Sequence, residues 1–497
     1  MIALLAVCLP ARLTAQTIDT IIIENGNVFH GIADGAPEFV VRLANALHIP
    51  TRQWVIRRRL LLDKGDTLEP ARLEETERAL RGLGVFRFVR VDTVRLKSQG
   101  DRLALAVVTA DGWSTQPQAS YTTQAGDEAW EIGFLERNFL GTATELSLNY
   151  SRDPDRRRFD VGFANPQFFA RRVRVRLRYS NLSDGHSGGW RVGLPFYETA
   201  ARYSVETYGE AVNRRILRFN NDVLQDSAQH HLSRVGVTSG VATHATSREY
   251  VRLLAGADWR RENIDSVYTT AVPYSTFTTV RAGLSMGRIR FRVLEQFNSY
   301  ARREDVDLSP SFYAGAVMER RLGYEAGGQV SAVWRRGFAV LRAEANGMDS
   351  TRTRGRLTIV TQNIRRHTLI THFEAGSLYK VRRGSEFDLW LEQRGPRLYG
   401  VHDFTGTRMV WLVIEDRILV AEEVFGMVGV GVAPFVDYGG AWYGDDSRLR
   451  GDVGLSLRFG PTRAVRGEAA EIAFGYRFGS GVGSKRWAVT LRKGVSF

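Results

Sequence analysis

The stretch RVRVRLRY, residues 172–179, decides the fold class because two kinds of side chain alternate along it. One set of alternate positions is apolar and consists of Val173, Val175, Leu177 and Tyr179. The other set is basic and consists of Arg172, Arg174, Arg176 and Arg178. Successive side chains of a β-strand point to opposite faces, so the segment predicts a strand with one apolar and one basic face.

The same alternation continues on both sides of this strand. Ala143–Tyr150 and Arg158–Phe163 alternate in the same way, and strand-like segments separated by turn signals follow one another from Gln116 to Phe497. This pattern is typical of a soluble sandwich whose polar face meets water. It is equally typical of an outer-membrane barrel whose polar face lines a wet lumen.

The length of the β-region and the energy of the basic face favour the barrel. About 380 residues accommodate roughly sixteen tilted strands together with their connections. An Arg side chain facing lipid near the midplane costs about 2–4 kcal/mol, so the four Arg of residues 172–179 have to face the lumen. We therefore predict a mainly β fold, a transmembrane antiparallel β-barrel of about 16 strands over residues 118–497, with these Arg forming a ladder on the lumen wall.

Residues 17–115 differ from the rest of the chain because both helical and strand patterns occur in them. They predict, in order, a strand at Ile21–Asn27, helices at Thr51–Leu62 and from Pro70 to Gly84, and strands at Phe86–Leu96 and Leu103–Thr109. These elements make a small α/β module that precedes the barrel. Residues 1–16 begin with an apolar stretch of nine residues, which fits either a cleaved export signal peptide or a buried amino-terminal segment.

Composition excludes several other classes. The longest weakly polar run, Val424–Val436, is about thirteen residues long, whereas a membrane-spanning helix needs about 20. Aromatic residues make up 11% of the chain, enough to bury a core, so a disordered protein is not expected. The single Cys excludes a disulfide framework and a multi-Cys metal site. The net charge of +14 is dispersed along the chain, so nucleic acid is not an expected partner.

Five sequence elements occur in a fixed order. They are LLLDKGD at Leu60–Asp66, LGVF at Leu83–Phe86, ERNFLG at Glu136–Gly141, NPQFF at Asn165–Phe169 and PFVDYGGAW at Pro434–Trp442. In this order they resemble the BamA/TamA-type superfamily of outer-membrane assembly and translocation barrels, the bacterial surface antigen family. The resemblance implies that residues 17–115 form one POTRA domain, placed in the periplasm of a Gram-negative-type bacterium, and that the barrel lies in its outer membrane.

The resemblance also implies a functional loop within the barrel. Counting strands back from the end of the chain places Glu392–Phe404 before the fifth strand from the end, where the family has a loop that folds into the lumen with an Arg-Gly-Phe/Tyr motif. Arg397 and Tyr399 match this motif, and Leu398 takes the place of the Gly. Arg394-Gly395 is a rival register, in which Pro396 would take the place of the aromatic residue.

By the same resemblance, Arg397 would pair inside the barrel with Glu415 and Asp437 on the two following strands and act as a lumen latch. The forked guanidinium of Arg can bind two carboxylates and keeps its charge in a partly dry lumen. At the end of the chain, Leu491, Val495 and Phe497 resemble the barrel's carboxy-terminal assembly signal.

The function implied by the resemblance is assistance in the insertion, assembly or translocation of other outer-membrane polypeptides. The expected partners are outer-membrane lipid, unfolded outer-membrane or secreted polypeptide clients, and periplasmic accessory proteins. Two alternatives remain open, a secretion pore dedicated to one passenger protein and a passive channel or surface antigen without insertase activity.

Residue patterns for catalysis or cofactors are not evident. The chain shows no Gly-x-Ser-x-Gly elbow and no paired-carboxylate constellation, so an enzyme is not expected. Gly479–Lys485 lacks the spacing of a phosphate-binding loop and is predicted to be a hairpin connection. His367 and His372 lie five residues apart on a predicted strand, hence on opposite faces, so no metal site and no cofactor is expected.

Overall fold

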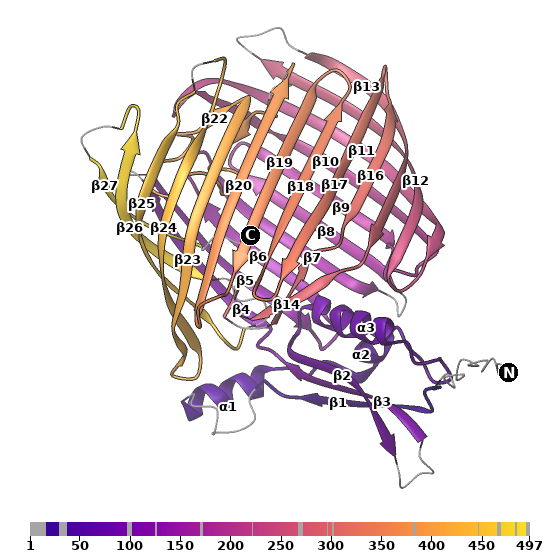
Figure 1. The fold of residues 1–497 in the computed structure, drawn as a ribbon. Helices are drawn as coiled ribbons and strands as arrows, with labels where there is room; N and C mark the ends of the chain where they lie inside the picture. The colour runs from indigo at the N-terminus through magenta and orange to yellow at the C-terminus, as the bar shows by residue number, and fades with distance from the viewer. Residues whose placement is uncertain are drawn as a thin grey trace, which may run out of the picture.

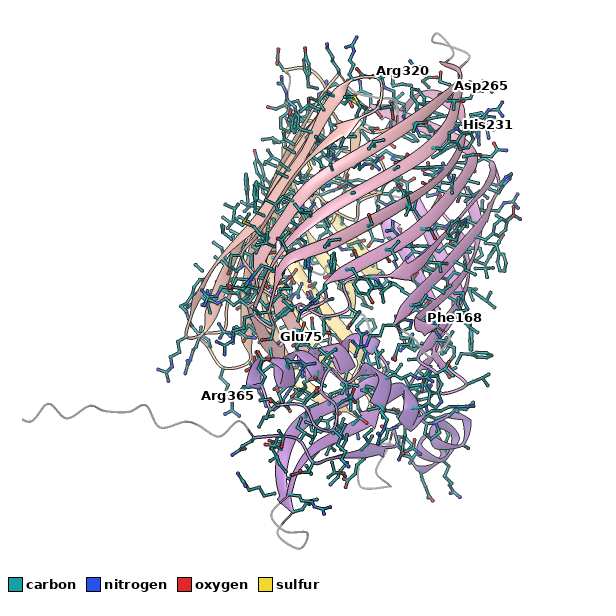
Figure 2. All side chains as sticks on the ribbon, turned by 90° about the vertical axis from the view of Figure 1, so that its right-hand side faces the viewer. Glu75, Phe168, His231, Asp265, Arg320 and Arg365 are labelled. Atoms are coloured by element: carbon teal, nitrogen blue, oxygen red, sulfur yellow. The ribbon has the colours of Figure 1, made fainter. Side chains whose placement is uncertain are left out.

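The computed structural model of the protein describes residues 16–28, 37–96, 102–124, 127–168, 172–220, 222–266, 272–295, 297–300, 303–380, 384–445, 447–464, 469–482 and 485–493. A small module of helices and short strands lies against one end of a large barrel (Figure 1). We call this end of the barrel the module end. The opposite end, where Arg320 and Asp265 lie in Figure 2, is the far end. Residues 1–15, which make up most of the predicted signal peptide, lie outside the described residues.

The module, as far as it is described, combines helices with a three-stranded sheet. Its elements are β1 (Thr20–Gly26), α1 (Glu38–Leu47), α2 (Gln53–Arg59), α3 (Pro70–Leu83), β2 (Phe86–Leu96) and β3 (Arg102–Asp111). The strand order is β1-β3-β2, with β1 parallel and β2 antiparallel to the central β3. Pro70 opens α3 and Gly84 ends it in the left-handed conformation at φ 70°, which favours glycine. Buried side chains such as Ile56, Leu80 and Leu105 form the module's core.

The rest of the chain forms the barrel. Among the described residues, twenty strands close into a single antiparallel barrel in which neighbours in sequence are neighbours in space. They are β4 (Thr115–Gln124), β5 (Asp127–Phe139), β6 (Thr144–Arg152), β7 (Arg157–Phe168), β8 (Val173–Leu182), β9 (Gly185–Leu194), β10 (Tyr203–Asn220), β11 (Val223–Ala245), β12 (Glu249–Ser266), β13 (Val272–Arg288), β16 (Ser311–Met318), β17 (Leu322–Trp334), β18 (Gly337–Gly347), β19 (Thr351–Thr361), β20 (His367–Tyr379), β23 (Arg408–Val424), β24 (Val428–Trp442), β25 (Arg450–Pro461), β26 (Ala470–Gly479) and β27 (Trp487–Lys493).

The predicted closed antiparallel barrel is confirmed, but the predicted count of about sixteen strands is wrong. The count failed because it left too much length for connections. Several strands are joined by hairpins of two residues, as between β8 and β9 and between β17 and β18. Such tight connections fit four more strands into the same stretch of chain.

The pairing register shows which face of each strand lines the lumen. Arg158 of β7 lines a cavity inside the barrel, and the register carries its face to Arg176 and Arg178 of β8. The opposite face of β8 carries Leu177 and Tyr179, which are 44% and 50% exposed. This outer face suits contact with lipid. In the described part of the chain, no helix is both long enough and apolar enough to cross a bilayer.

The module is fastened to the barrel by buried hydrogen bonds. Glu75 of α3 lies at the boundary between the two in Figure 2, where its Oε1 accepts from the backbone N and Oγ1 of Thr199 at 2.7 and 2.6 Å. The Nδ2 of Asn138, which belongs to the ERNFLG element, donates to the Oγ1 of Thr51 at 2.9 Å and to the carbonyl of Ile49 at 3.2 Å. The ERNFLG element singled out in the sequence therefore lies where module and barrel meet.

Candidate functional site

The loop between β20 and β23, residues 380–407, carries the candidate site. Within it, β21 (Phe387–Asp388) pairs with β22 (Thr405–Gly406) in a small two-stranded sheet. The loop leaves the far end of the barrel and turns back inside it, since Leu398 and Tyr399 are only 1% and 3% exposed and contact strands β24 to β26. We call residues 380–407 the lumen loop.

Arg397 lies at the centre of the contacts that the lumen loop makes with the barrel wall. Its Nε and Nη2 bind the two carboxylate oxygens of Asp437 at 2.6 and 3.0 Å, and its backbone N donates to Asp437 at 3.2 Å. Its Nη1 lies 2.9 Å from Glu415 Oε2. The guanidinium also lies over the ring of Phe435, 3.8 Å from the centroid. The structure thus brings together the three charged residues that the sequence singled out, and all three are almost fully buried.

Further charges surround this group. Glu415 Oε1 binds Arg417 at 2.6 Å and Arg458 at 2.7 Å, and Glu471 lies 3.6 Å from Arg397. We call the six residues together the latch network, namely Arg397, Glu415, Arg417, Asp437, Arg458 and Glu471. Its members alternate in charge through space, which offsets the desolvation that each of them undergoes on burial. Because breaking a buried pair leaves an uncompensated charge, the network holds the lumen loop firmly in place.

The residues beside Arg397 fix the rest of the loop. Tyr399 donates through its hydroxyl to the carbonyls of Gly451 and Phe478, at 2.9 and 3.0 Å. Leu398 packs in a small apolar cluster with Phe435, and its Cδ1 lies 3.0 Å from where a Cβ on Gly475 would stand. The absence of a side chain at Gly475 therefore makes room for a Leu at the position where the family motif has Gly.

The rival register is also located by the structure. Arg394 does not reach Asp437; instead it binds Glu374 of β20 at 2.9 Å and Glu392 of its own loop at 2.7 Å. Arg397 is therefore the residue that occupies the carboxylate pocket, and Arg394 braces the loop against the neighbouring wall.

His402 ties the outer part of the lumen loop to the β6–β7 turn and to β10 at the far end. Its Nε2 lies 3.0 Å from Asp155 in the β6–β7 turn, and its Nδ1 contacts Asp388 of β21. Its ring stacks on Phe219 of β10 with centroids 3.6 Å apart. Burial on its own would lower the pKa of His402, but the hydrogen bonds to Asp155 and Asp388 outweigh it and raise the pKa to about 9. The histidine is therefore charged at neutral pH.

The Arg ladder divides into two parts. Arg174, Arg176 and Arg178 share one face of β8, and the register places that face on the lumen wall. Arg172 precedes the strand, donates to the carbonyl of Leu60 at 3.2 Å and so contacts the module. The ladder therefore supplies both a basic stretch of lumen wall and one contact at the module end.

The residues of the carboxy-terminal signal are only partly described. Leu491 belongs to β27 and pairs with Thr123 of β4, which closes the barrel. Val495 and Phe497 lie outside the described residues. In the described residues, this junction contains a single register pair, whereas β4 and β5 share ten. We call the junction of β27 with β4 the seam.

Three charged residues of the latch network, Arg417, Arg458 and Glu471, were missed by sequence reasoning. Each lies on a strand and at an alternate position that the register places on the lumen face. Extending the parity argument from Glu415 to its neighbours would have found them. Among the described residues, no group of three or more His, Cys, Asp or Glu is arranged to hold a metal ion.

A cavity of about 700 Å³ remains inside the barrel. Its walls include the lumen loop at Trp390 and Tyr399 and the strands at Arg158 and Trp411. Polar and apolar side chains share this wall.

Comparisons with known proteins bear on this barrel. Residues 138–314 match the Omp85 superfamily domain. The chain is similar to the crystal structure of BamA from Haemophilus ducreyi lacking POTRA domains 1–3, with 13% identity over 95% of this chain and 84% of that chain and a TM-score of 0.36. It is also similar to CdiB from Escherichia coli, with 11% identity over 96% of this chain and 76% of that chain and a TM-score of 0.48. No curated protein matches the chain.

Proposed function

We propose, from the Omp85 superfamily domain that residues 138–314 match, that the chain is a BamA/TamA-type outer-membrane barrel. On this premise it assists the insertion, assembly or translocation of other outer-membrane polypeptides. The module over residues 17–115 would act as a single POTRA domain in the periplasm, and residues 118–497 as the membrane barrel. The clients would be unfolded outer-membrane or secreted polypeptides, received with or without periplasmic accessory proteins.

The observation that carries this proposal is the seam. A closed barrel satisfies all its backbone hydrogen-bonding groups by pairing each strand with two neighbours. At the seam, one described register pair, Leu491 with Thr123, stands where other neighbouring strands share many. This junction is where the first and last strands of the barrel meet, and opening it would expose strand edges that can pair with a client segment.

The module offers a second place for such pairing. In its sheet, β1 and β2 are the two outer strands, so each has one edge without a neighbour in the described sheet. An incoming extended segment could add to either edge through backbone hydrogen bonds, largely without regard to its sequence. The lumen latch of Arg397, Tyr399, Glu415 and Asp437 would keep the lumen loop folded inside while the seam works.

A disulfide across the seam tests the proposal. In a Cys8→Ser background, Thr123→Cys with Leu491→Cys would lock β4 to β27. Proteoliposomes that contain the reduced variant should accelerate the folding of an unfolded outer-membrane barrel, measured by heat-modifiable gel mobility, and oxidation should abolish this. The matched control is Tyr121→Cys with Trp130→Cys, a register pair of the neighbouring hairpin β4–β5, for which oxidation should have no effect.

Three results would count against the proposal. Equal acceleration by the locked and the reduced protein would mean that the seam takes no part. Ion conductance without any acceleration of client folding would favour the passive channel, and export of one co-expressed passenger without any effect on other barrels would favour the dedicated secretion pore.

A further inference from the structure

A two-stranded hairpin lies between β13 and β16 at the module end of the barrel. It consists of β14 (Phe291–Glu295) and β15 (Arg303–Asp307), which pair with each other and not with the barrel. Since β13 pairs directly with β16, the barrel wall is complete without this insertion. The hairpin therefore needs another explanation than closure of the barrel.

The hairpin packs against the inner wall of the barrel. Its Leu294, Phe297 and Leu308 form one buried cluster with residues of β18 to β20, which are Phe338, Val340, Val360 and Ile370. These four wall residues lie on the lumen face, because the register places them in line with the cavity-lining Arg342 and Arg356. They are at most 5% exposed. An apolar stretch of wall is unfavourable in a wet lumen unless protein covers it, and the hairpin covers this stretch.

Polar contacts hold the hairpin at its base. Arg292 donates to three backbone carbonyls of the turn between β17 and β18, those of Trp334, Arg335 and Gly337, at 2.9, 2.9 and 2.7 Å. Ser331 of β17 donates to the carbonyl of Leu308 at 2.6 Å. These bonds hold the hairpin against the lumen face of β17 and the turn between β17 and β18.

At its tip the hairpin reaches strand β24. Tyr300 lies against β24, where a Cβ on Gly429 or on Gly431 would stand 2.5 or 2.6 Å from its ring or hydroxyl. Arg417 of β23 donates to the carbonyl of Phe297 at 2.6 Å. The two glycines form a slot for the tyrosine, so the hairpin spans the inner wall from β17 to β24.

The hairpin is also bound to the module. Arg81 of α3 binds Asp305 of β15 in a forked pair, with Nε and Nη2 each 2.7 Å from a carboxylate oxygen. Arg78 of α3 lies over the ring of Phe291, 4.6 Å from the centroid. A movement of α3 relative to the barrel would therefore pull on the hairpin.

At the inner end, the hairpin meets the latch network. Arg417 binds the hairpin carbonyl and, through Nε, Glu415 at 2.6 Å, and Glu415 in turn binds Arg397 of the lumen loop. A continuous line of contacts thus runs from α3 through the hairpin to the lumen loop. The cavity inside the barrel lies between the two, with Phe297 and Val306 of the hairpin in its wall.

We propose that the hairpin of β14 and β15, together with Phe297, Tyr300 and Leu308, is a gate that closes the lumen at the module end, and that movement of α3 displaces it. The lumen loop closes the far end and the hairpin closes the module end. Displacing the hairpin would join the cavity to the space around the module and uncover the apolar wall at Phe338, Val340, Val360 and Ile370. This proposal holds whether the clients are inserted into the membrane or passed through the barrel.

Planar-bilayer conductance of the whole protein tests the gate. Replacing residues 291–307 by a short Gly-Asn turn should increase the mean single-channel conductance at least several-fold. The charge reversal Asp305→Arg should raise the open probability about tenfold, and adding Arg81→Glu should restore it to the wild-type level. The matched control is Arg303→Ala on the same hairpin, whose ion pair with Glu295 is exposed, and it should leave conductance unchanged.

If the deletion variant does not fold, a labelling measurement still tests the gate. In a Cys8→Ser background, Val340→Cys should resist a membrane-impermeant maleimide, and adding Asp305→Arg should make it react at least several times faster. Heat-modifiable mobility would show that each variant is a folded barrel. Unchanged conductance on deletion, or equal labelling of Val340→Cys with and without Asp305→Arg, would overturn the gate. A failure of Arg81→Glu to reverse the effect of Asp305→Arg would overturn the role of α3.

Discussion

Removing the guanidinium of Arg397 is the perturbation whose effect can be worked out most fully from the contacts. In the Arg397→Ala variant, Asp437 and Glu415 remain buried, but their situations differ. Among the described residues, every ion pair of Asp437 is with Arg397, whereas Glu415 keeps Arg417 and Arg458 at 2.6 and 2.7 Å. The loss therefore falls mainly on Asp437.

The magnitude follows from this difference. Removing one partner of a buried ion pair costs about 3–5 kcal/mol, because a charge is left without compensation. Adding Asp437→Asn to Arg397→Ala removes that charge and should recover most of the loss. Adding Glu415→Gln should recover none of it and should make the protein less stable still, since Arg417 and Arg458 then face a neutral amide.

The assay is equilibrium unfolding in urea with the protein in lipid vesicles, followed by tryptophan fluorescence. Arg397→Ala should lower the free energy of unfolding by about 3–5 kcal/mol. Arg408→Ala is the control, because its pair with Asp445 is exposed and such pairs contribute about 0–1 kcal/mol. A loss below about 1 kcal/mol for Arg397→Ala, or a better rescue by Glu415→Gln than by Asp437→Asn, would refute the reasoning.

Three further predictions concern the ends of the lumen loop and the module. The pKa of His402 is about 9 because its two hydrogen-bonded aspartates outweigh burial, so its stabilising effect is complete below the ordinary value of about 6.5 and is lost as the pH rises through 9. Cleavage of the lumen loop by trypsin, corrected for protease activity, should therefore rise between pH 7 and pH 10, and His402→Gln should abolish this step. Gly475→Leu should clash with the backbone of β25 at Val453, displace Leu398 and lower the free energy of unfolding by about 1–3 kcal/mol, whereas Gly355→Ala, which meets open space, should change it little. Glu75→Ala should loosen the module from the barrel, detected as faster proteolysis of the module while heat-modifiable mobility stays intact; an unchanged rate would contradict this role of Glu75.

Side-chain parity explains why part of the site was predictable. A strand puts alternate residues on one face, so Glu415 and Asp437, each next to an apolar residue, could be assigned to the interior from their sequence neighbours alone. Whether Arg397 lies close enough to bind these two carboxylates is determined by tertiary structure. It depends on a loop that folds back through the barrel, and only the resemblance to a known family indicated that.

The strand count and the gate were hidden for different physical reasons. Strand number depends on how short the connections are, and the two-residue turn Arg335-Arg336 lacks the Asn-Gly or Asp-Gly pair that marks a hairpin in sequence. The hairpin of β14 and β15 is short and mixes polar and apolar residues, so its own pattern does not mark it as an insertion into the wall. A signal does exist on the partner strands. Phe338–Leu341 is apolar on both faces, which is what a lumen wall covered by protein requires.

The apolar side chains that the hairpin buries also determine which ligand could open the gate. Burying the side chains of Leu294, Phe297 and Leu308 stabilises the closed state by about 1.5–3 kcal/mol each, or roughly 5–9 kcal/mol together. At the lower figure, about one molecule in several thousand would be open by thermal fluctuation alone. A ligand shifts such an equilibrium only by the difference between its affinities for the two states, so about 5 kcal/mol is needed at the lower figure to populate the open and closed states equally. An extended client segment with apolar side chains can supply this by covering the same wall that the hairpin leaves. The gate should therefore open in exchange for a client and stay shut without one.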